Sequence, residues 1–298
     1  MSFRSVAGAA GTLIVGTGYV GGRVAEQLRQ ADPTGPIYTV TRSEQNAARL
    51  AARGFTPLIA DWTDRRTLAH LPRCARVLVA VSYDPRSGKS REVSQVGGLS
   101  NLLEFADPAA DVVYLSTTGV FHQSAGEWVD ENSPARPIGV GGIAHLRAEE
   151  LLHRRRPLGR WVILRLSGIY GPGRIPRSRD VLRGMPLDGP NEGYLNLIHR
   201  DDAAGAVIAA WERAEHRRRL YLVSDDAPVL RRAFYEQVAR CLRVPPPTFA
   251  PSNSPSLSAR SMSHKRIWNR RLRRDLLPRM LYPDYVQGLT AVLKSETM

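Results

Sequence analysis

The sequence contains little cysteine and almost no lysine. Its two cysteines, Cys74 and Cys241, stand far apart and outside any C-x-x-C or C-x-x-H spacing, so neither a disulfide framework nor a zinc site is indicated. This cysteine usage favours a reducing, cytoplasmic setting. Lysine occurs only at Lys89, Lys265 and Lys294, so nearly all of the 42 basic residues are arginine.

The arginine excess gives the chain a net charge of +14 and a pI near 10.5. A surface of this kind attracts polyanions non-specifically. The basic residues are scattered, with clusters at 154–156, 217–219 and 265–274, and no nucleic-acid-binding motif accompanies them. We interpret them as solvated faces that attract anionic ligands, rather than as a nucleic-acid interface.

The chain also lacks a long hydrophobic run. No window approaches 18 uninterrupted apolar residues, so we expect no membrane span. The segment from Val6 to Val20 is apolar and follows Arg4, but several glycines interrupt it. This pattern suits a strand that enters a glycine loop better than a secretory segment.

Short β-rich runs alternate with segments of helical period from Leu13 to about Leu222. This alternation predicts an α/β fold, a doubly wound parallel sheet with helices on both faces. The expected strands are residues 13–15, 37–40, 57–60, 77–81, 112–115, 161–166 and 220–223. Helices are expected on the apolar stripes Val20/Val24/Leu28, Val96/Leu99/Leu103 and Ala203/Val207/Trp211, and over 45–53 with Gly54 as a left-handed cap.

Asp201 or Asp202 is the expected N-cap of the helix that carries Ala203. After residue 223 the pattern changes to one helix on Phe234 and Val238, a proline run, a Ser/Pro-rich stretch to 263 and an amphipathic C-terminal segment. We therefore expect an α/β domain over 1–170, completed by about 195–223, and the G-x-G-x-x-G motif at residues 16–21 makes it a dinucleotide-binding Rossmann domain. Residues 171–194 and 224–298 would form a small substrate or interaction lobe.

A G-x-G-x-x-G motif lies between the first strand and the first helix, which is the context that this motif requires. Gly16 permits the tight turn, Gly18 lets backbone approach a pyrophosphate, and Gly21 lets the helix pack against the strand. The helix N-terminus then faces the phosphates with unpaired N–H groups. Thr17, Tyr19 and Val20 belong to the same expected dinucleotide site.

The residues at the end of the second strand determine the specificity for NAD or NADP, because an acid there would hydrogen-bond the ribose hydroxyls of NAD. The strand ends instead in Arg42 and Ser43, which favours NADP over NAD because arginine binds a ribose phosphate as a charge-assisted donor. The alternative is that Arg42 is an ordinary surface residue. We expect Asp61 and Trp62 at the adenine edge, and Val81 and Ser116 further along the cofactor.

Several further motifs follow the glycine loop in order. They are Ala60-Asp61, the strand from Val112 to Phe121, Asp130-Glu131, the helix segment from Ala148 to Leu152, the segment from Arg165 to Gly173, and the segment from Ile198 to Ala203. Together these motifs resemble the extended short-chain dehydrogenase/reductase family, the NAD-dependent epimerase/dehydratase group, over nearly the whole chain. The resemblance implies a Rossmann fold and a nicotinamide cofactor.

The resemblance also implies a catalytic Ser or Thr, a Tyr, and a Lys four residues beyond the Tyr. Thr117 matches the hydroxyl position, but Gly141 stands where the Tyr belongs and His145 where the Lys belongs. The chain has no Tyr between Tyr114 and Tyr170 and no Lys between Lys89 and Lys265. We therefore expect an atypical member that has lost the usual acid/base pair.

Thr117 and His145 are the candidate catalytic residues, and Tyr170, Arg174 and His199 the candidate substrate residues. Each has an alternative role: a turn hydroxyl for Thr117, an exposed helix residue for His145, core packing for Tyr170, a solvated charge for Arg174 and a turn hydrogen bond for His199. No metal site is expected.

The sequence predicts an NADP-dependent oxidoreductase or epimerase that acts on a carbonyl or sugar-like substrate, seated between the sheet edge and the appended lobe. The alternative is a non-catalytic module that senses NADP and couples its occupancy to a partner.

Overall fold

The computed structural model describes residues 11–187, 191–213, 220–249 and 264–296. The arginine cluster at 217–219, the apolar residues before Gly11 and most of the Ser/Pro-rich stretch lie outside the described residues. Within the described part, no helix is long and apolar enough to cross a membrane.

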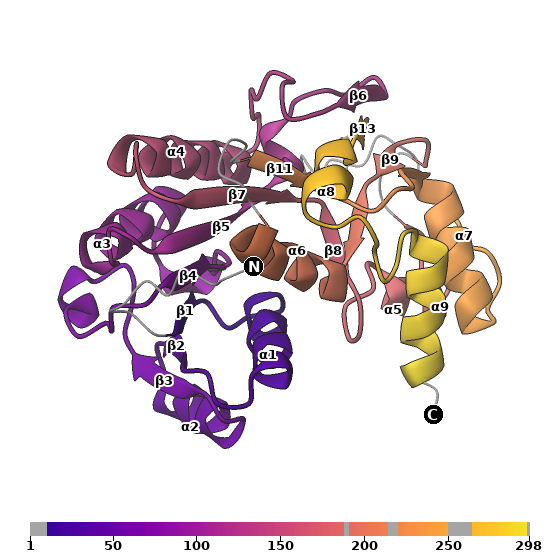
Figure 1. Ribbon diagram of the computed structural model, residues 1–298. Coiled ribbons are helices and arrows are strands. Elements are labelled where there is room, and N and C mark those ends of the chain that lie inside the picture. Colours follow the sequence, from indigo (N-terminus) through magenta and orange to yellow (C-terminus); the bar gives the residue numbers. More distant parts are fainter. Residues whose placement is uncertain (1–10, 188–190, 214–219, 250–263, 297–298) are drawn as a thin grey trace. The chain divides into compact units, whose positions relative to one another are not determined.

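A seven-stranded sheet is the centre of the fold (Figure 1). Its spatial order is β11-β7-β5-β4-β1-β2-β3, so the chain starts in the middle, runs to one edge and returns past β1 to the other. This order is typical of the doubly wound nucleotide-binding fold. The strands are β1 (Thr12–Val15), β2 (Ile37–Thr41), β3 (Thr56–Ile59), β4 (Arg76–Val79), β5 (Asp111–Thr117), β7 (Trp161–Leu166) and β11 (Leu220–Val223).

The register of the parallel strands brings their carboxyl ends together at one edge. Val15 pairs with Val40 on β2 and with Val79 on β4, and Val40 pairs in turn with Leu58 on β3. The loops that leave β1, β2, β3 and β4 therefore begin at the same level. Ligands bind at this edge in open α/β sheets.

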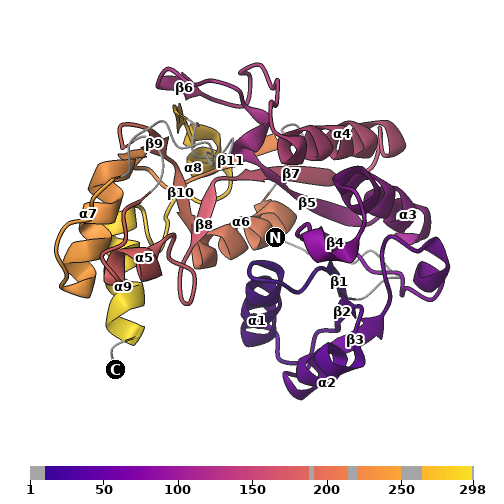
Figure 2. The ribbon, with the colours of Figure 1, turned by 180° about the vertical axis from the view of Figure 1, so that it is seen from behind.

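The helices of the sheet are placed by apolar stripes. They are α1 (Gly21–Ala31), α2 (Glu44–Ala52), α3 (Gly98–Phe105), α4 (Val140–Arg155) and α6 (Arg200–Arg213). Leu99 and Leu102 of α3 and Leu152 of α4 form one buried cluster with residues of β1, β4 and β5. Helix α1 covers the opposite side of these strands (Figures 1 and 2) and buries Val24.

The described residues group into two compact units. The first contains those within Met1–Ser116, Ile143–Leu164 and Ala204–Leu220; the second contains those within Thr117–Gly142, Arg165–Ala203 and Tyr221–Met298. Of the residues expected in the Rossmann domain (1–170 and about 195–223), those at 117–142, 165–170, 195–203 and 221–223 group with the second unit.

The second unit holds short strand pairs and packed helices. Its elements are β6 (Glu127–Val129), β8 (Gly168–Tyr170), α5 (Ser178–Leu182), β9 (Tyr194–Leu195), β10 (Leu197–His199), β12 (Val229–Leu230), α7 (Arg231–Leu242), β13 (Lys265–Ile267), α8 (Arg270–Asp275) and α9 (Tyr285–Glu296). Phe234 and Val238 of α7 and Leu289 of α9 share one core with Tyr170. The expected amphipathic C-terminal segment is thus helical in part and packed.

One expected helix cap is wrong. Helix α6 begins at Arg200, so both Asp201 and Asp202 lie in its first turn. The carboxylate of Asp202 accepts from the backbone N–H groups of Leu281 (2.7 Å) and Tyr282 (2.9 Å) instead. Aspartate can cap a helix or hold the backbone of a distant loop, and the sequence alone does not show which of these two roles a given aspartate has.

Candidate functional site

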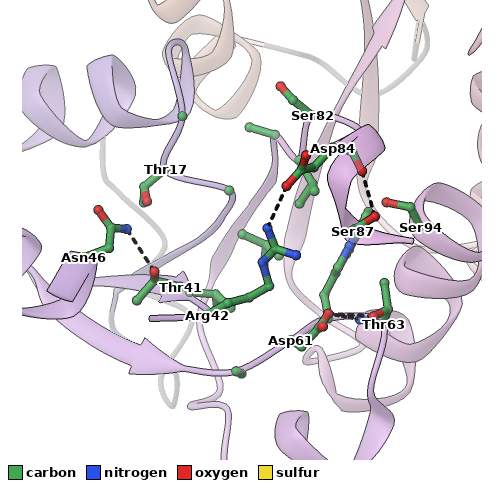
Figure 3. A pocket seen from close by; sticks show the side chains of 18 of the residues that line it. Thr17, Thr41, Arg42, Asn46, Asp61, Thr63, Ser82, Asp84, Ser87 and Ser94 are labelled. Atoms are coloured by element: carbon green, nitrogen blue, oxygen red, sulfur yellow. Dashed lines mark hydrogen bonds and ion pairs between the residues drawn. The ribbon is translucent and has the colours of Figure 1, made fainter. Parts of the chain in front are cut away.

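A pocket of about 340 Å³ opens where β1, β2, β3 and β4 end. Every lining residue belongs to the first unit. Figure 3 shows the polar side chains that converge on the pocket from the loops after these four strands. The lining residues are Val15, Gly16, Thr17, Gly18, Val40, Thr41, Arg42, Asn46, Ala60, Asp61, Trp62, Thr63, Ala80, Val81, Ser82, Asp84, Ser87, Lys89 and Ser94.

The glycine loop between β1 and α1 forms one wall. Gly16 has φ +98°, and a Cβ there would lie 2.7 Å from the carbonyl oxygen of Ala80. A Cβ at Gly21 would overlap the carbonyl oxygen of Gly16, so both positions require glycine. At Gly18 a Cβ would meet no atom within 4 Å, and this residue lines the pocket, so the backbone is open there to a ligand.

The N-terminus of α1 follows directly. Its N-cap Val20 makes no side-chain cap, and the first turn carries no acid. The first N–H groups and the positive end of the helix dipole are thus not neutralised by a capping side chain, which suits an anion such as a pyrophosphate.

Arg42 occupies the end of β2 and lies beside an acid from another loop. Its Nη2 lies 3.5 Å from Oδ2 of Asp84, which follows β4 (Figure 3). The backbone N–H of Arg86 lowers the pKa of Asp84, so this carboxylate is charged near neutral pH. Ser43 caps α2 by accepting from the backbone N–H of Asn46 (3.2 Å), and the Asn46 amide donates to Thr41 (2.9 Å).

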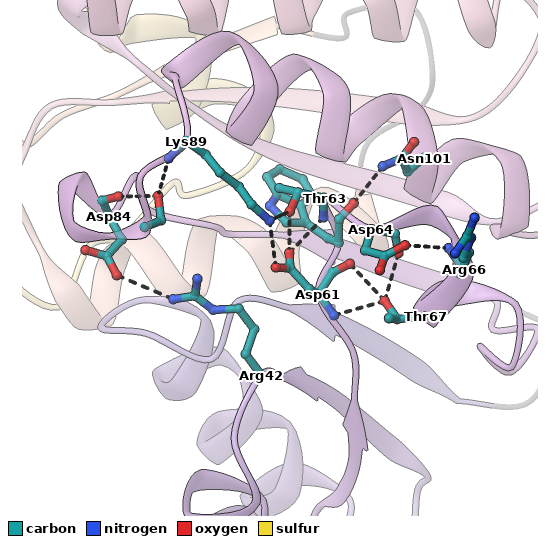
Figure 4. Close-up of polar contacts among 11 residues, drawn as sticks. Arg42, Asp61, Thr63, Asp64, Arg66, Thr67, Asp84, Lys89 and Asn101 are labelled. Atoms are coloured by element: carbon teal, nitrogen blue, oxygen red, sulfur yellow. Dashed lines mark hydrogen bonds and ion pairs between the residues drawn. The ribbon is translucent and has the colours of Figure 1, made fainter.

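Asp61 occupies the end of β3 and is held by two neighbours (Figure 4). Its Oδ1 accepts from the Thr63 backbone N–H at 2.9 Å, and its Oδ2 lies 2.9 Å from Nζ of Lys89. Burial raises the pKa of Asp61, but the hydrogen bonds from Thr63 and Lys89 outweigh it, so the pKa is lowered overall. Oδ1 also accepts from the Thr63 hydroxyl at 2.6 Å, so Oδ2 is the oxygen that retains acceptor capacity for a ligand amino group.

The expected cofactor-binding residues divide into two groups. Those that line the pocket are Gly16, Thr17, Gly18, Arg42, Asp61, Trp62 and Val81. Those placed outside its lining are Tyr19, Val20, Gly21, Ser43 and Ser116. Ser116 donates instead to the buried carboxylate of Glu149 at 2.5 Å.

Sequence reasoning missed the contribution of the loop after β4. Asp84, Ser87 and Lys89 all line the pocket from this loop, whereas only Val81 was expected there. A signal was available: in this fold the loop after the fourth strand leaves the same sheet edge as the glycine loop.

His145 lies inside a hydrogen-bond chain of the first unit. Its Nδ1 is 2.9 Å from the hydroxyl of Tyr114, and its Nε2 is 3.0 Å from the amide nitrogen of Gln95. A neutral ring satisfies both contacts when Nδ1 carries the hydrogen, since Nε2 then accepts from the amide. Thr117, in the second unit, accepts from the backbone N–H of Gly119 at 3.0 Å and retains its own hydrogen as a donor.

The expected substrate residues are all in the second unit. Tyr170 is fully buried, with its hydroxyl 3.5 Å from the carbonyl of Asp284, which corresponds to the packing alternative. His199 is also buried; its Nδ1 accepts from the backbone N–H of Asp201 at 3.2 Å, and its ring contacts Tyr170 and Tyr282. Arg174 is exposed in the turn that its backbone closes with Gly171.

Together, a glycine turn, an uncapped helix N-terminus and polar residues at the carboxyl ends of a β3-β2-β1-β4-β5 sheet define a dinucleotide-binding Rossmann protein. Residues 12–223 match the family described as "NAD dependent epimerase/dehydratase family". The chain belongs to this family.

Two curated relatives and one solved structure illustrate the relationship. Protein YeeZ of Escherichia coli (strain K12) is 33% identical over 138 residues, which cover 46% of this chain and 48% of that protein. The 3-diazoavenalumate denitrifying reductase of a Streptomyces species is 33% identical over 154 residues, 49% of this chain and 48% of the reductase. The chain thus spans about half the length of these curated relatives.

The solved structure is that of a functionally unknown conserved protein from Silicibacter pomeroyi DSS. It has a TM-score of 0.78 and 26% sequence identity, and the match covers 97% of this chain and 100% of that one. The similarity therefore extends over both compact units.

Proposed function

We propose that the chain is an NADP-preferring oxidoreductase or epimerase that acts on a carbonyl or sugar-like substrate without the family's Tyr/Lys pair. The observation that carries the cofactor preference is Arg42, which enters the pocket at the position where NAD-binding folds place an acid. A guanidinium there binds a 2′-phosphate by two charge-assisted hydrogen bonds. The similar reductase from Streptomyces supports redox chemistry.

The residues of the pocket fit the adenosine half of such a cofactor. Gly18 and the N-terminus of α1 would receive the pyrophosphate, Arg42 the ribose phosphate, and Asp61 the adenine amino group. When bound, the cofactor supplies or accepts hydride at its nicotinamide ring.

Thr117 takes the role of an oxyanion donor in this proposal. Its Oγ1 accepts from the Gly119 backbone N–H at 3.0 Å, and the hydroxyl hydrogen remains available to donate to a substrate oxygen. A threonine hydroxyl does not act as a general base near neutral pH. The proton therefore comes from solvent, and turnover is slow, since a positioned acid typically contributes on the order of 10²- to 10⁴-fold.

Calorimetry with NADP and NAD tests the cofactor assignment. We expect NADP to bind more tightly than NAD, and Arg42→Ala to remove the difference by weakening NADP about tenfold. Arg49, an exposed arginine on α2 outside the pocket lining, provides the control in Arg49→Ala, which should leave both affinities unchanged. Equal affinities in the wild type would contradict the assignment.

Oxidation of NADPH by a panel of carbonyl compounds tests the reaction. With any active substrate, Thr117→Ala should lower turnover by at least about tenfold, because an oxyanion donor typically contributes that much or more. Thr117→Ser keeps the hydroxyl and should retain most of the activity. Unchanged turnover in Thr117→Ala would count against the proposal.

A second candidate is a non-catalytic module that senses NADP. It is supported by His145, which stands at the family's lysine position with both ring nitrogens hydrogen-bonded within the first unit. If this candidate is correct, we expect saturable NADP binding without turnover and a partner protein whose affinity for the chain changes when NADP is bound. A partner whose affinity is the same with and without NADP would exclude it.

A further inference from the structure

The loop after β4 presents a fixed carboxylate to the pocket. Asp84 caps the short helix η2 (Pro85–Ser87): its Oδ1 accepts from the Arg86 backbone N–H at 3.0 Å, and its own carbonyl accepts from the Ser87 hydroxyl at 2.7 Å. The second oxygen, Oδ2, lies beside Arg42. Oδ1 of the carboxylate thus holds the turn, and Oδ2 lies toward Arg42 (Figure 4).

Further contacts brace the loop against movement. Lys89 reaches Asp61 at the end of β3, the Tyr83 hydroxyl donates to the carbonyl of Lys89 at 3.1 Å, and the Arg91 guanidinium lies 4.0 Å from the centre of the Tyr83 ring. Arg42 is different, because 57% of its side chain is exposed and its contact with Asp84 is 3.5 Å long. An exposed ion pair of this kind contributes little, so an anionic ligand with stronger contacts can draw Arg42 away from Asp84.

We infer that Asp84 is a specificity-determining residue that competes with the ribose 2′-phosphate of the dinucleotide for Arg42. A 2′-phosphate must take Arg42 away from a carboxylate that stays in place, whereas a 2′-hydroxyl leaves the Arg42–Asp84 pair intact. Arg42 favours NADP, and Asp84 reduces the resulting ratio of the affinities for NADP and NAD. The chain therefore binds both dinucleotides. This inference rests on the proposed function.

The decisive test uses adenosine fragments, because they report on this pocket alone. Calorimetry with adenosine 2′,5′-bisphosphate and with 5′-AMP separates the 2′-phosphate from the rest of the ligand. We expect Asp84→Asn to tighten the bisphosphate about fivefold and to change 5′-AMP less than twofold, the scale of one charge near a protein surface. Asparagine also caps helices well, so the turn at η2 is retained.

Two further variants sharpen the test. Asp64 caps the helical turn η1 (Arg65–Leu68) through the Arg66 backbone N–H at 3.0 Å, but it lies outside the pocket lining. Asp64→Asn therefore makes the same change of charge and cap elsewhere, and it should not alter the affinity ratio. In an Arg42→Ala background the gain from Asp84→Asn should disappear, because Arg42 is no longer there to compete for; the exposed Arg86, whose Nε lies 3.4 Å from Oδ1 of Asp84, lies outside the pocket lining.

The outcomes separate this inference from the proposed function. If both fragments bind and Asp84→Asn leaves their ratio unchanged, the inference is overturned while the dinucleotide site stands. An equal gain in Asp64→Asn, or an undiminished gain without Arg42, overturns it too, because the effect would then be one of general charge. If neither the fragments nor the dinucleotides bind to the wild type, the proposed function fails as well.

Discussion

Alanine substitutions at Gly16 and Gly18 should separate folding from ligand binding within one loop. At Gly16 the backbone has φ +98°, which is unfavourable for residues with a side chain, and a Cβ would lie 2.7 Å from backbone atoms of Ala80. At Gly18 the φ is not in this region and the Cβ position is open. Two similar substitutions two residues apart should thus have opposite consequences.

The expected magnitudes follow from these geometries. Gly16→Ala combines backbone strain of about 1–3 kcal/mol with overpacking of about 1–3 kcal/mol. The sum of about 2–6 kcal/mol should lower Tm by roughly 4–24 °C, given about 2–4 °C per kcal/mol for a chain of this size class. Gly18→Ala should leave Tm unchanged or slightly raised, because alanine reduces the entropy of the unfolded chain.

For ligand binding, Gly18→Ala is the informative variant. The methyl group of Gly18→Ala occupies the space that a pyrophosphate needs, so the affinity for NADP should fall about tenfold or more, about 1.4 kcal/mol. Thermal unfolding and calorimetry on the same preparations measure both quantities. A Gly18→Ala protein that is stable and binds NADP as well as the wild type would refute the placement of the pyrophosphate at this loop.

Three further predictions concern stability. Burial lowers the pKa of Lys265 to about 8, so between pH 8 and 10.5 the unfolded chain binds more protons and the free energy of unfolding rises with pH. In urea unfolding, Lys265→Met should lack this rise and should be more stable than the wild type at pH 7 by up to about 3 kcal/mol. A variant whose free energy of unfolding depends on pH as in the wild type would contradict this prediction. Gly288→Ala should cost about 1–3 kcal/mol, because its Cβ would overlap the Tyr170 hydroxyl and lie 2.7 Å and 2.9 Å from ring carbons Cζ and Cε2. Tyr170→Phe should restore only part of this loss, since the ring carbons remain; wild-type stability of Gly288→Ala in urea unfolding would contradict the contact. Arg156 is buried and donates to the carbonyls of residues 107 (2.5 Å) and 110 (2.9 Å), so Arg156→Ala should cost about 2–4 kcal/mol by denaturant unfolding, whereas the exposed Arg154→Ala should be near neutral.

The sheet and its glycine loop could be predicted because their signals are local. Each β-rich run of the central sheet became a strand, and the limits of β7 and β11 coincide with the expected ones. The glycine at position 54 has φ +78° and follows α2, as a left-handed cap requires. The alternation of these runs with helical segments predicted a parallel sheet, and the parallel pairing of β1 with β2 and β4 confirms it.

The remaining features depend on contacts between residues far apart in the chain. The pairs Arg42–Asp84 and Asp61–Lys89 join residues that are 42 and 28 positions apart, and no periodicity marks them. The same holds for the strand pair of β6 with β13, whose strands are only three residues long. Short strands paired over long separations carry no pattern that distinguishes them from loops.

Hydrogen–deuterium exchange with and without saturating NADPH tests most directly whether the pocket at the ends of β1 to β4 holds the cofactor. Peptides that cover the glycine loop, the end of β2 and the loop after β4 should exchange more slowly when NADPH is bound, because a ligand in the pocket protects the backbone that lines it. Slowed exchange confined to other segments, or none in these three, would contradict the account.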